Sequence, residues 1–171
     1  MPRKSKVPAP TPAASGVELD RKRDPTQTRA LETCERILDA AANLLGEVGI
    51  ERLSTNLICE RAGLSPPALY RYYPNKYAVL AELGVRLMMS QNELLQTWAT
   101  PATMKLPAAK FEQRLCQLFL DTLALTRAAI AGEWITRALR AVPSLAPVGI
   151  GSHDHVTGLV AHLAVALLLP M

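Results

Sequence analysis

Apolar residues recur at intervals of three and four positions through most of the chain after residue 27, which is the periodicity of amphipathic helices. The first such stretch begins near Thr28, and Gly49 is well placed to follow its last turn. Its apolar positions are Leu31, Cys34, Ile37, Leu38, Ala41, Leu44, Leu45 and Val48. The alternating β-branched runs that are typical of strands are missing. The pattern therefore predicts an all-α protein.

Two short helical patterns follow and meet at a turn over residues 62–65. Ser54 is a suitable N-cap for the first of them, and Gly63 permits left-handed backbone in the turn. Ser65 opens the second, whose first fully helical residue is expected to be Pro67, because a residue that precedes a proline resists the α conformation. The second pattern carries aromatic, hydroxyl and cationic side chains and almost no acid. This is typical of a helix-turn-helix whose second helix enters a DNA groove.

Longer helical patterns fill the rest of the chain. Pro74 ends the preceding helix, and Asn75 is placed to cap the next one. The expected helices cover residues 76–98 and 108–131, the second of which either continues or bends near Gly132 into residues 134–142, and a final helix starts near residue 152. The proline- and glycine-containing stretches at residues 101–107 and 143–151 are expected to be loops. We interpret His153-Asp154-His155 as the polar start of the final helix and not as a metal site, because acidic residues are common near helix N-termini.

These elements divide the chain into three parts. Residues 1–27 are rich in Pro, Ala, Ser and Thr and are expected to be a disordered basic arm. Residues 28–76 are expected to form a helix-turn-helix DNA-binding head, and residues 77–171 are expected to form a helical body. The formal net charge is +4, and the surplus lies in residues 1–36, with eight Lys or Arg against five Asp or Glu. From charge alone, a polyanionic partner and a merely soluble tail are equally good interpretations.

Several functional classes find no support in the composition. The three cysteines show no paired spacing, so we interpret them as small apolar residues of a cytoplasmic protein and expect no metal or cofactor. Residues 1–16 lack the apolar segment of a secretory signal, and residues 156–169 are too short and interrupted to span a membrane. No nucleophile and base, phosphate loop or paired carboxylates occur at usable spacing, which argues against an enzyme.

The head resembles that of the tetracycline-repressor (TetR) family of bacterial transcription regulators. The resemblance covers about fifty residues with matching spacing, and beyond residue 82 it is one of helix pattern only. The matching segments are residues 36–41, 45–49, 58–65 and 67–76, together with Leu80. Cys59 and Leu53 depart from the residues usual in the family without threatening the fold. The resemblance implies a homodimeric repressor that binds a palindromic operator in double-stranded DNA and leaves it when a small-molecule effector fills the helical body.

The resemblance also implies which residues contact DNA. Thr55 and Asn56 begin the second helix and reach phosphate or base edges, and Lys76 matches the family's phosphate-binding lysine at a helix N-terminus. The exposed recognition positions are matched by Ser65, Pro67, Ala68, Tyr70, Arg71 and Tyr72. Tyr73 and Leu69 are expected to pack in the core. Arg21, Lys22, Arg23 and Arg29 either add phosphate contacts from the arm or belong to a disordered tail.

The sequence of the helical body predicts less about function than that of the head. Residues placed to line a cavity for a hydrophobic or amphipathic effector are Trp98, Phe111, Cys116, Phe119 and Trp134, although such a stripe is more often simple core. Members of the family usually continue with two further helices that form the dimer's four-helix bundle. The sequence therefore predicts an incomplete regulatory domain, or a dimer that uses the final helix and the 108–131 helix. The alternative function is a protein-interaction module with weak or no DNA binding.

Overall fold

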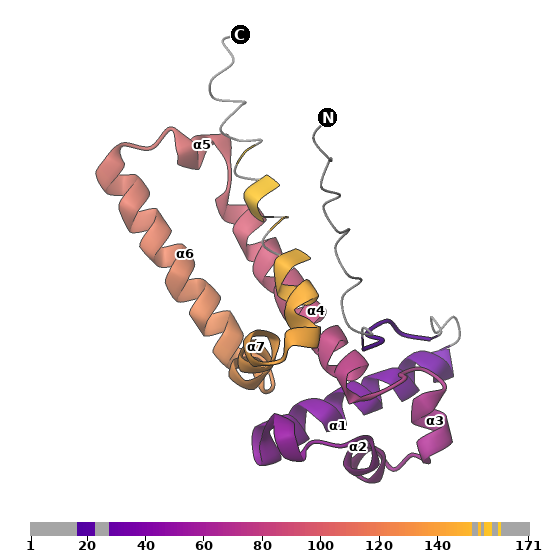
Figure 1. Cartoon of the computed structure of the whole chain (residues 1–171). Helices are drawn as coiled ribbons and strands as arrows, with labels where there is room; N and C mark the ends of the chain where they lie inside the picture. The colour runs from indigo at the N-terminus through magenta and orange to yellow at the C-terminus, as the bar shows by residue number, and fades with distance from the viewer. Residues whose placement is uncertain (1–16, 23–27, 152–153, 155, 159–160, 162–171) are drawn as a thin grey trace, which may run out of the picture.

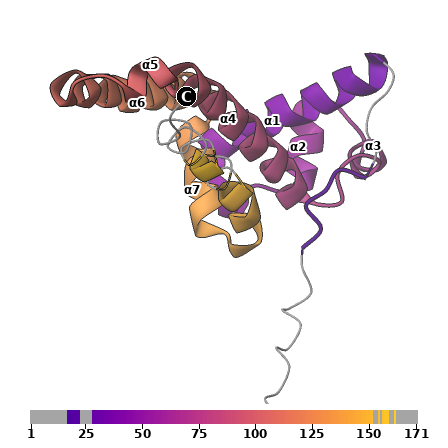
Figure 2. The same cartoon turned by 90° about the horizontal axis from the view of Figure 1, so that it is seen from above.

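The computed structural model describes residues 17–22, 28–151, 154, 156–158 and 161, and every regular element within them is helical. Figures 1 and 2 show the helices labelled α1, α2 and α3 gathered at one end, with α4 leading away from them and α6 returning beside it. The helices are α1 (Thr28–Arg52), α2 (Thr55–Ala62), α3 (Pro66–Tyr70), α4 (Lys76–Trp98), α5 (Pro101–Met104), α6 (Ala108–Ala128), α7 (Gly132–Ala141) and the 3-10 turn η1 (Pro143–Leu145). The prediction of an all-α fold with a helix-turn-helix head is confirmed for the described residues.

Local signals place the caps of α2 and the start of α4 as the sequence predicts. The other expected ends are wrong, because α1 continues past Gly49 to Arg52, and α3 covers Pro66–Tyr70, starting before Pro67 and ending before Pro74. Gly49 has a positive φ of 74° and kinks α1 before its last three residues. The Ser54 hydroxyl accepts a hydrogen bond from the amide of Leu57, and the side chain of Asn75 accepts one from the amide of Ala78. Gly63 adopts the left-handed conformation at φ 61° and ψ 42°. The head is therefore assembled from helices whose caps are encoded within a few residues of each end.

One continuous apolar core joins the head to the body. Its fully buried members include Ile37, Leu45, Ile58 and Tyr73, and α7 adds Ile135 from the body side. Leu69 and Tyr73 are both fully buried, as the sequence predicts. Since α4 begins in this core and extends into the body, the two parts share packing and are not separate globules.

In the body, the structure differs from the sequence-based prediction at two segments that contain proline. The stretches at 101–107 and 143–151 were expected to be loops, but Pro101 and Pro143 occupy first positions of α5 and η1, and residues 146–151 are helical. Proline is well suited to the first turn of a helix, where its missing N–H needs no partner. Helix α6 ends at Ala128, and a 100° bend separates it from α7. The expected helix from residue 152 lies mostly outside the described residues.

The last part of the predicted disordered arm is docked on the head, so the prediction is wrong for residues 17–22. The amide of Lys22 donates to the carbonyl of Tyr72 at 2.8 Å, and the Asn75 side chain donates to the carbonyl of Glu18 at 2.9 Å. Arg21, which we considered for a phosphate contact, instead pairs with Glu82 and donates to the Tyr73 hydroxyl. These partners are far away in sequence, so composition alone cannot predict the docking.

Helix α6 is the least covered element of the body, and none of its residues is fully buried. Its exposed face carries Phe119, Leu120 and Leu123. Among the described residues, no single helix has the length and apolar character to cross a membrane, although the bent pair α6 and α7 together meets that criterion.

Candidate nucleic-acid interface

An arginine of α1 fixes the turn between α2 and α3. The Arg36 guanidinium donates to the carbonyl of Ala62 and, at 3.3 Å, to that of Gly63. These carbonyls end α2, where a cation is favoured by the helix dipole as well as by the hydrogen bonds. Arg36 therefore sets the position of the turn from which α3 starts. The sequence identified this residue only as part of a family motif and not by its role.

Helix α3 presents an exposed polar surface beside the start of α2, which is called the recognition surface below. Tyr70 is 42% exposed, and its hydroxyl lies 2.9 Å from the hydroxyl of Thr55. Asn56, Ser65, Pro67 and Arg71 are exposed, and Thr55 and Ala68 are half-buried. No acidic residue occurs between Glu60 and Glu82 in the sequence, so this surface is formed by neutral and cationic groups. It is suited to hydrogen bonding with phosphates and base edges.

Tyr72 does not occupy the exposed position that we predicted. Its side chain is only 7% exposed, because α3 ends at Tyr70 and the chain turns before reaching it. The prediction came from the family resemblance, which placed Tyr72 among the exposed recognition positions, whereas α3 ends two residues before it. The Arg71 guanidinium lies 5.9 Å from the centre of the Tyr72 ring, so Tyr72 supports a cation beside the recognition surface.

Lys76 lies at the N-terminus of α4 as predicted, but its ammonium group already has partners. It donates to the carbonyl of Leu53 at 2.8 Å and to that of Ile50 at 3.1 Å. The same group lies 5.4 Å from the centre of the Tyr77 ring. Lys76 thus joins the start of α4 to the segment between α1 and α2. An ammonium has three N–H donors, so one more acceptor can still be bound.

Replacing Lys76 with methionine is expected to lower the free energy of unfolding by about 1–3 kcal/mol, because two backbone carbonyls lose a charged donor while the aliphatic stem is kept. Urea denaturation measures this change, and the exposed Lys110 of α6, changed to methionine, is the matched control. Unchanged stability in Lys76→Met would contradict the structural role of the ammonium and leave phosphate binding as its only role.

The relatives of this chain match the part that forms this surface. The family model described as "Bacterial regulatory proteins, tetR family" matches residues 37–83. The head of this chain is therefore similar to the DNA-binding head of the TetR family. The chain is 36% identical over 59 residues to the class D tetracycline repressor protein of Escherichia coli, covering 34% of this chain and 27% of that protein. It is 35% identical over 89 residues to the HTH-type transcriptional regulator EthR of Mycobacterium tuberculosis, covering 52% and 41%.

A solved structure extends the likeness beyond the TetR-type head. The fold is similar to that of a TetR-family transcriptional regulator from Streptomyces coelicolor, with a TM-score of 0.51 and 24% identity. The match covers 75% of this chain and 69% of that one, and at this identity it shows the fold alone. The chain spans only about a quarter to two fifths of the length of the curated relatives, so their activity is not transferred as a whole.

The residues predicted to line an effector cavity are not brought together. Trp98 and Phe111 do meet, with ring centres 5.7 Å apart, and form a small core between α4 and α6. Cys116 and Phe119 lie on the exposed side of α6, where Phe119 is 67% exposed. Trp134 is also exposed and lies against the Arg137 guanidinium. The five residues therefore do not line one cavity in this structure.

Ion pairs connect the TetR-type head to α4. Arg86 of α4 donates to both carboxylate oxygens of Glu35 in α1 at 2.7 Å, and it also contacts Glu82. The hydrogen bonds that Arg86 donates to Glu35 lower the pKa of the Glu35 carboxyl and raise the pKa of the Arg86 guanidinium. The lowered pKa means that this pair stabilises the fold at neutral pH and less as the pH falls through the titration of Glu35. Both side chains are about half exposed, so the contribution is small.

Proposed function

We propose that this protein is a DNA-binding transcriptional regulator that reads duplex DNA with α3. The observation that carries the proposal is the exposed pair Tyr70 and Arg71 beside Thr55, on an acid-free surface of a TetR-type head. In this arrangement α3 lies in the major groove and the start of α2 lies along the backbone. Arg71 supplies a cation for guanine or phosphate, and the two hydroxyls supply donors and acceptors.

The proposed mode of action is repression of a palindromic operator by a homodimer, with release by a small-molecule effector. The relatives named tetracycline repressor proteins support repression as the direction of control. Helix α4 supports effector-induced release from the operator, because it runs from the DNA-facing end of the head into the body. It also carries Arg86, which forms an ion pair with Glu35 of α1. A ligand that tilts α4 would therefore move the head relative to its operator. The protein is proposed to be cytoplasmic and to have no enzymatic activity.

A gel-shift experiment with duplex fragments from the region upstream of the protein's own gene tests the proposal. The full-length protein is expected to bind one fragment in a manner that weakens as salt rises. Tyr70→Ala and Arg71→Ala are each expected to lower the affinity by about 1–3 kcal/mol, or roughly 5- to 150-fold. Lys76→Ala is also expected to weaken binding, through the head's geometry as well as through charge.

Arg137→Ala is the matched control, because Arg137 is an exposed arginine on the body that also lies over an aromatic ring. It is expected to bind as the unaltered protein does. Equal affinity of Tyr70→Ala and the unaltered protein would contradict the assigned contacts. Failure of the unaltered protein to bind any duplex would contradict the proposed function.

The exposed apolar face of α6 favours a second candidate, a protein-interaction module with little DNA binding. Phe119 and Leu120 are among the most exposed large apolar side chains described, and such patches commonly mark association surfaces. Sedimentation with and without duplex DNA separates the two candidates. A regulator forms a DNA-dependent complex, whereas an interaction module associates to the same extent without DNA.

A further inference from the structure

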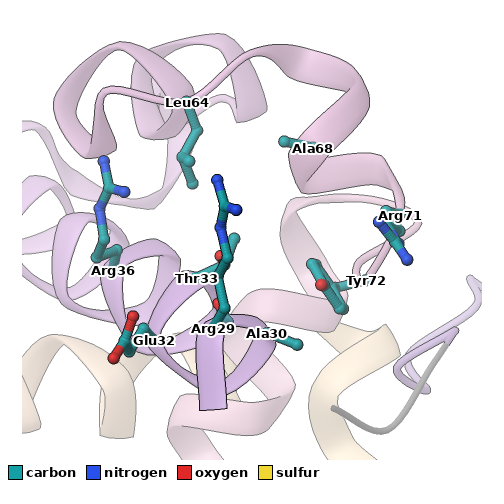
Figure 3. A pocket seen from close by; sticks show the side chains of 9 residues that line it. All are labelled: Arg29, Ala30, Glu32, Thr33, Arg36, Leu64, Ala68, Arg71 and Tyr72. Carbon is teal, nitrogen blue, oxygen red and sulfur yellow. The ribbon is translucent and has the colours of Figure 1, made fainter. Parts of the chain in front are cut away.

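A cationic cleft lies between α1 and α3, beside the recognition surface (Figure 3). It has a volume of about 500 Å³ and is lined by the first turns of α1 on one side and by Leu64, Ala68 and Arg71 on the other. Three guanidinium groups line it, those of Arg29, Arg36 and Arg71, against one carboxylate, that of Glu32. Fixed positive charge in a concave site is the usual requirement for holding a phosphate.

The arginines that line the cleft differ in whether their guanidinium groups already have hydrogen-bond partners in the protein. Arg36 is held by the carbonyls at the end of α2, and both of these hydrogen bonds use Nη2. The Arg29 guanidinium has no partner among the described residues. Figure 3 shows it extending from α1 toward the α2–α3 side, between Arg36 and Ala68, whereas the Glu32 carboxylate lies at the opposite edge. Arg29 is thus an uncommitted cation aimed into the cleft.

We propose that this cleft binds a phosphate group of the DNA backbone, with Arg29 as its main ligand and Arg36 and Arg71 as flanking charges. The inference rests on the proposed function and deepens it. The cleft shares Ala68 and Arg71 with the surface that faces the bases, and backbone phosphates border both sides of a groove that a helix enters. A phosphate bound here fixes α1 against the backbone and sets the angle of α3.

This role predicts a particular signature, because a phosphate contact contributes affinity and carries no sequence information. Arg29→Gln is expected to weaken binding to the operator and to a scrambled duplex by the same factor. It is also expected to reduce the slope of log affinity against log salt by about 0.9 for each bound head. Arg29→Lys keeps a phosphate-binding cation and is expected to retain most of the slope.

The experiment is a fluorescence anisotropy titration of labelled operator and scrambled duplexes across a salt series, with the full-length protein and its variants. Arg114→Gln removes an exposed arginine from α6 and is the charge-matched control. A parallel thermal-shift arm uses inorganic pyrophosphate without DNA. Because Arg29 is exposed, its variants are expected to keep the melting temperature of the unaltered protein.

The outcomes separate this inference from the proposed function. A smaller salt slope in Arg29→Gln, with the control unchanged, supports the DNA phosphate site. An unchanged slope in Arg29→Gln, while the unaltered protein still binds DNA, overturns the inference and leaves the proposed function standing. Stabilisation by pyrophosphate that requires Arg29, combined with an unchanged slope, assigns the cleft to a free anion and also overturns it. Absence of DNA binding by the unaltered protein contradicts both.

Discussion

Replacing Leu69 with alanine is expected to lower the free energy of unfolding by about 2–5 kcal/mol, because it removes a fully buried side chain and leaves a cavity. Leu69 is the one buried side chain of α3, so it anchors the recognition helix to the head. Its carbonyl also accepts hydrogen bonds from the amides of Tyr72 and Tyr73, which close the turn after α3. We therefore expect the orientation of α3 to be lost together with stability.

Leu120→Ala is the matched control for this change, because Leu120 is 60% exposed on α6. The same chemical deletion there is expected to change stability by no more than about 0.5 kcal/mol. Urea denaturation gives both values from the midpoints and slopes of the transitions. Equal destabilisation by the two substitutions would contradict the assignment of Leu69 as the anchor of α3.

The second large effect is expected at the corner between α6 and α7. A Cβ atom added at Gly132 would lie 2.0 Å from the backbone carbonyl oxygen of Thr126 and 3.1 Å from the Cβ of Ala129. The backbone oxygen cannot rotate away as a side chain does, so the corner must open. Gly132→Ala is expected to lower the free energy of unfolding by about 3 kcal/mol, at the upper end of the usual cost of overpacking.

Gly46 provides the control for Gly132→Ala. It lies on the exposed side of α1, and a Cβ atom there would meet no atom within 4 Å. Gly46→Ala is therefore expected to stabilise the protein by about 0.5–1 kcal/mol, because alanine has the lower entropic cost in a helix. Denaturation of the two variants is expected to give shifts of opposite sign. Stabilisation by Gly132→Ala would contradict the tight corner.

The head could be predicted from the sequence because its signals are local. Ser54 and Asn75 cap helices that begin at the next residue, and Gly63 lies in the left-handed turn that the pattern requires. The docking of residues 17–22 could not be predicted in this way. It depends on Arg21 reaching Glu82 and Tyr73, which are more than fifty residues away in the sequence.

The structure of the body was predicted less well, because helical periodicity identifies an apolar face but not the helix that packs against it. Helix α6 has two adjacent apolar stripes, and the sequence assigned Phe111 and Phe119 to the same side. The structure half-buries Phe111 against Trp98 and exposes Phe119. Successive residues of a helix are rotated by about 100°, so one helix can carry two neighbouring apolar stripes. Only the packing of α4 decides which of the two stripes is covered.

In the recognition surface, the exposure of Tyr70 and Arg71 agrees with the sequence-based prediction, and that of Tyr72 does not. Tyr70 is exposed as expected because α3 is helical up to that residue. Tyr72 follows the helix, so the helical period no longer sets its direction, and it turns into the core. Lys76 was placed correctly at the start of α4, but its bonds to Ile50 and Leu53 arise from tertiary contacts. Whether these residues contact DNA stays a prediction.

The most direct test of the central claim, that α3 and the start of α2 bind duplex DNA, is a map of backbone amide shifts. Isotope-labelled full-length protein would be titrated with a duplex selected by the protein from a random pool. We expect the largest shifts between Thr55 and Lys76, with the exposed face of α6 unchanged. Shifts confined to α6, or none at any residue of the head, would contradict the claim.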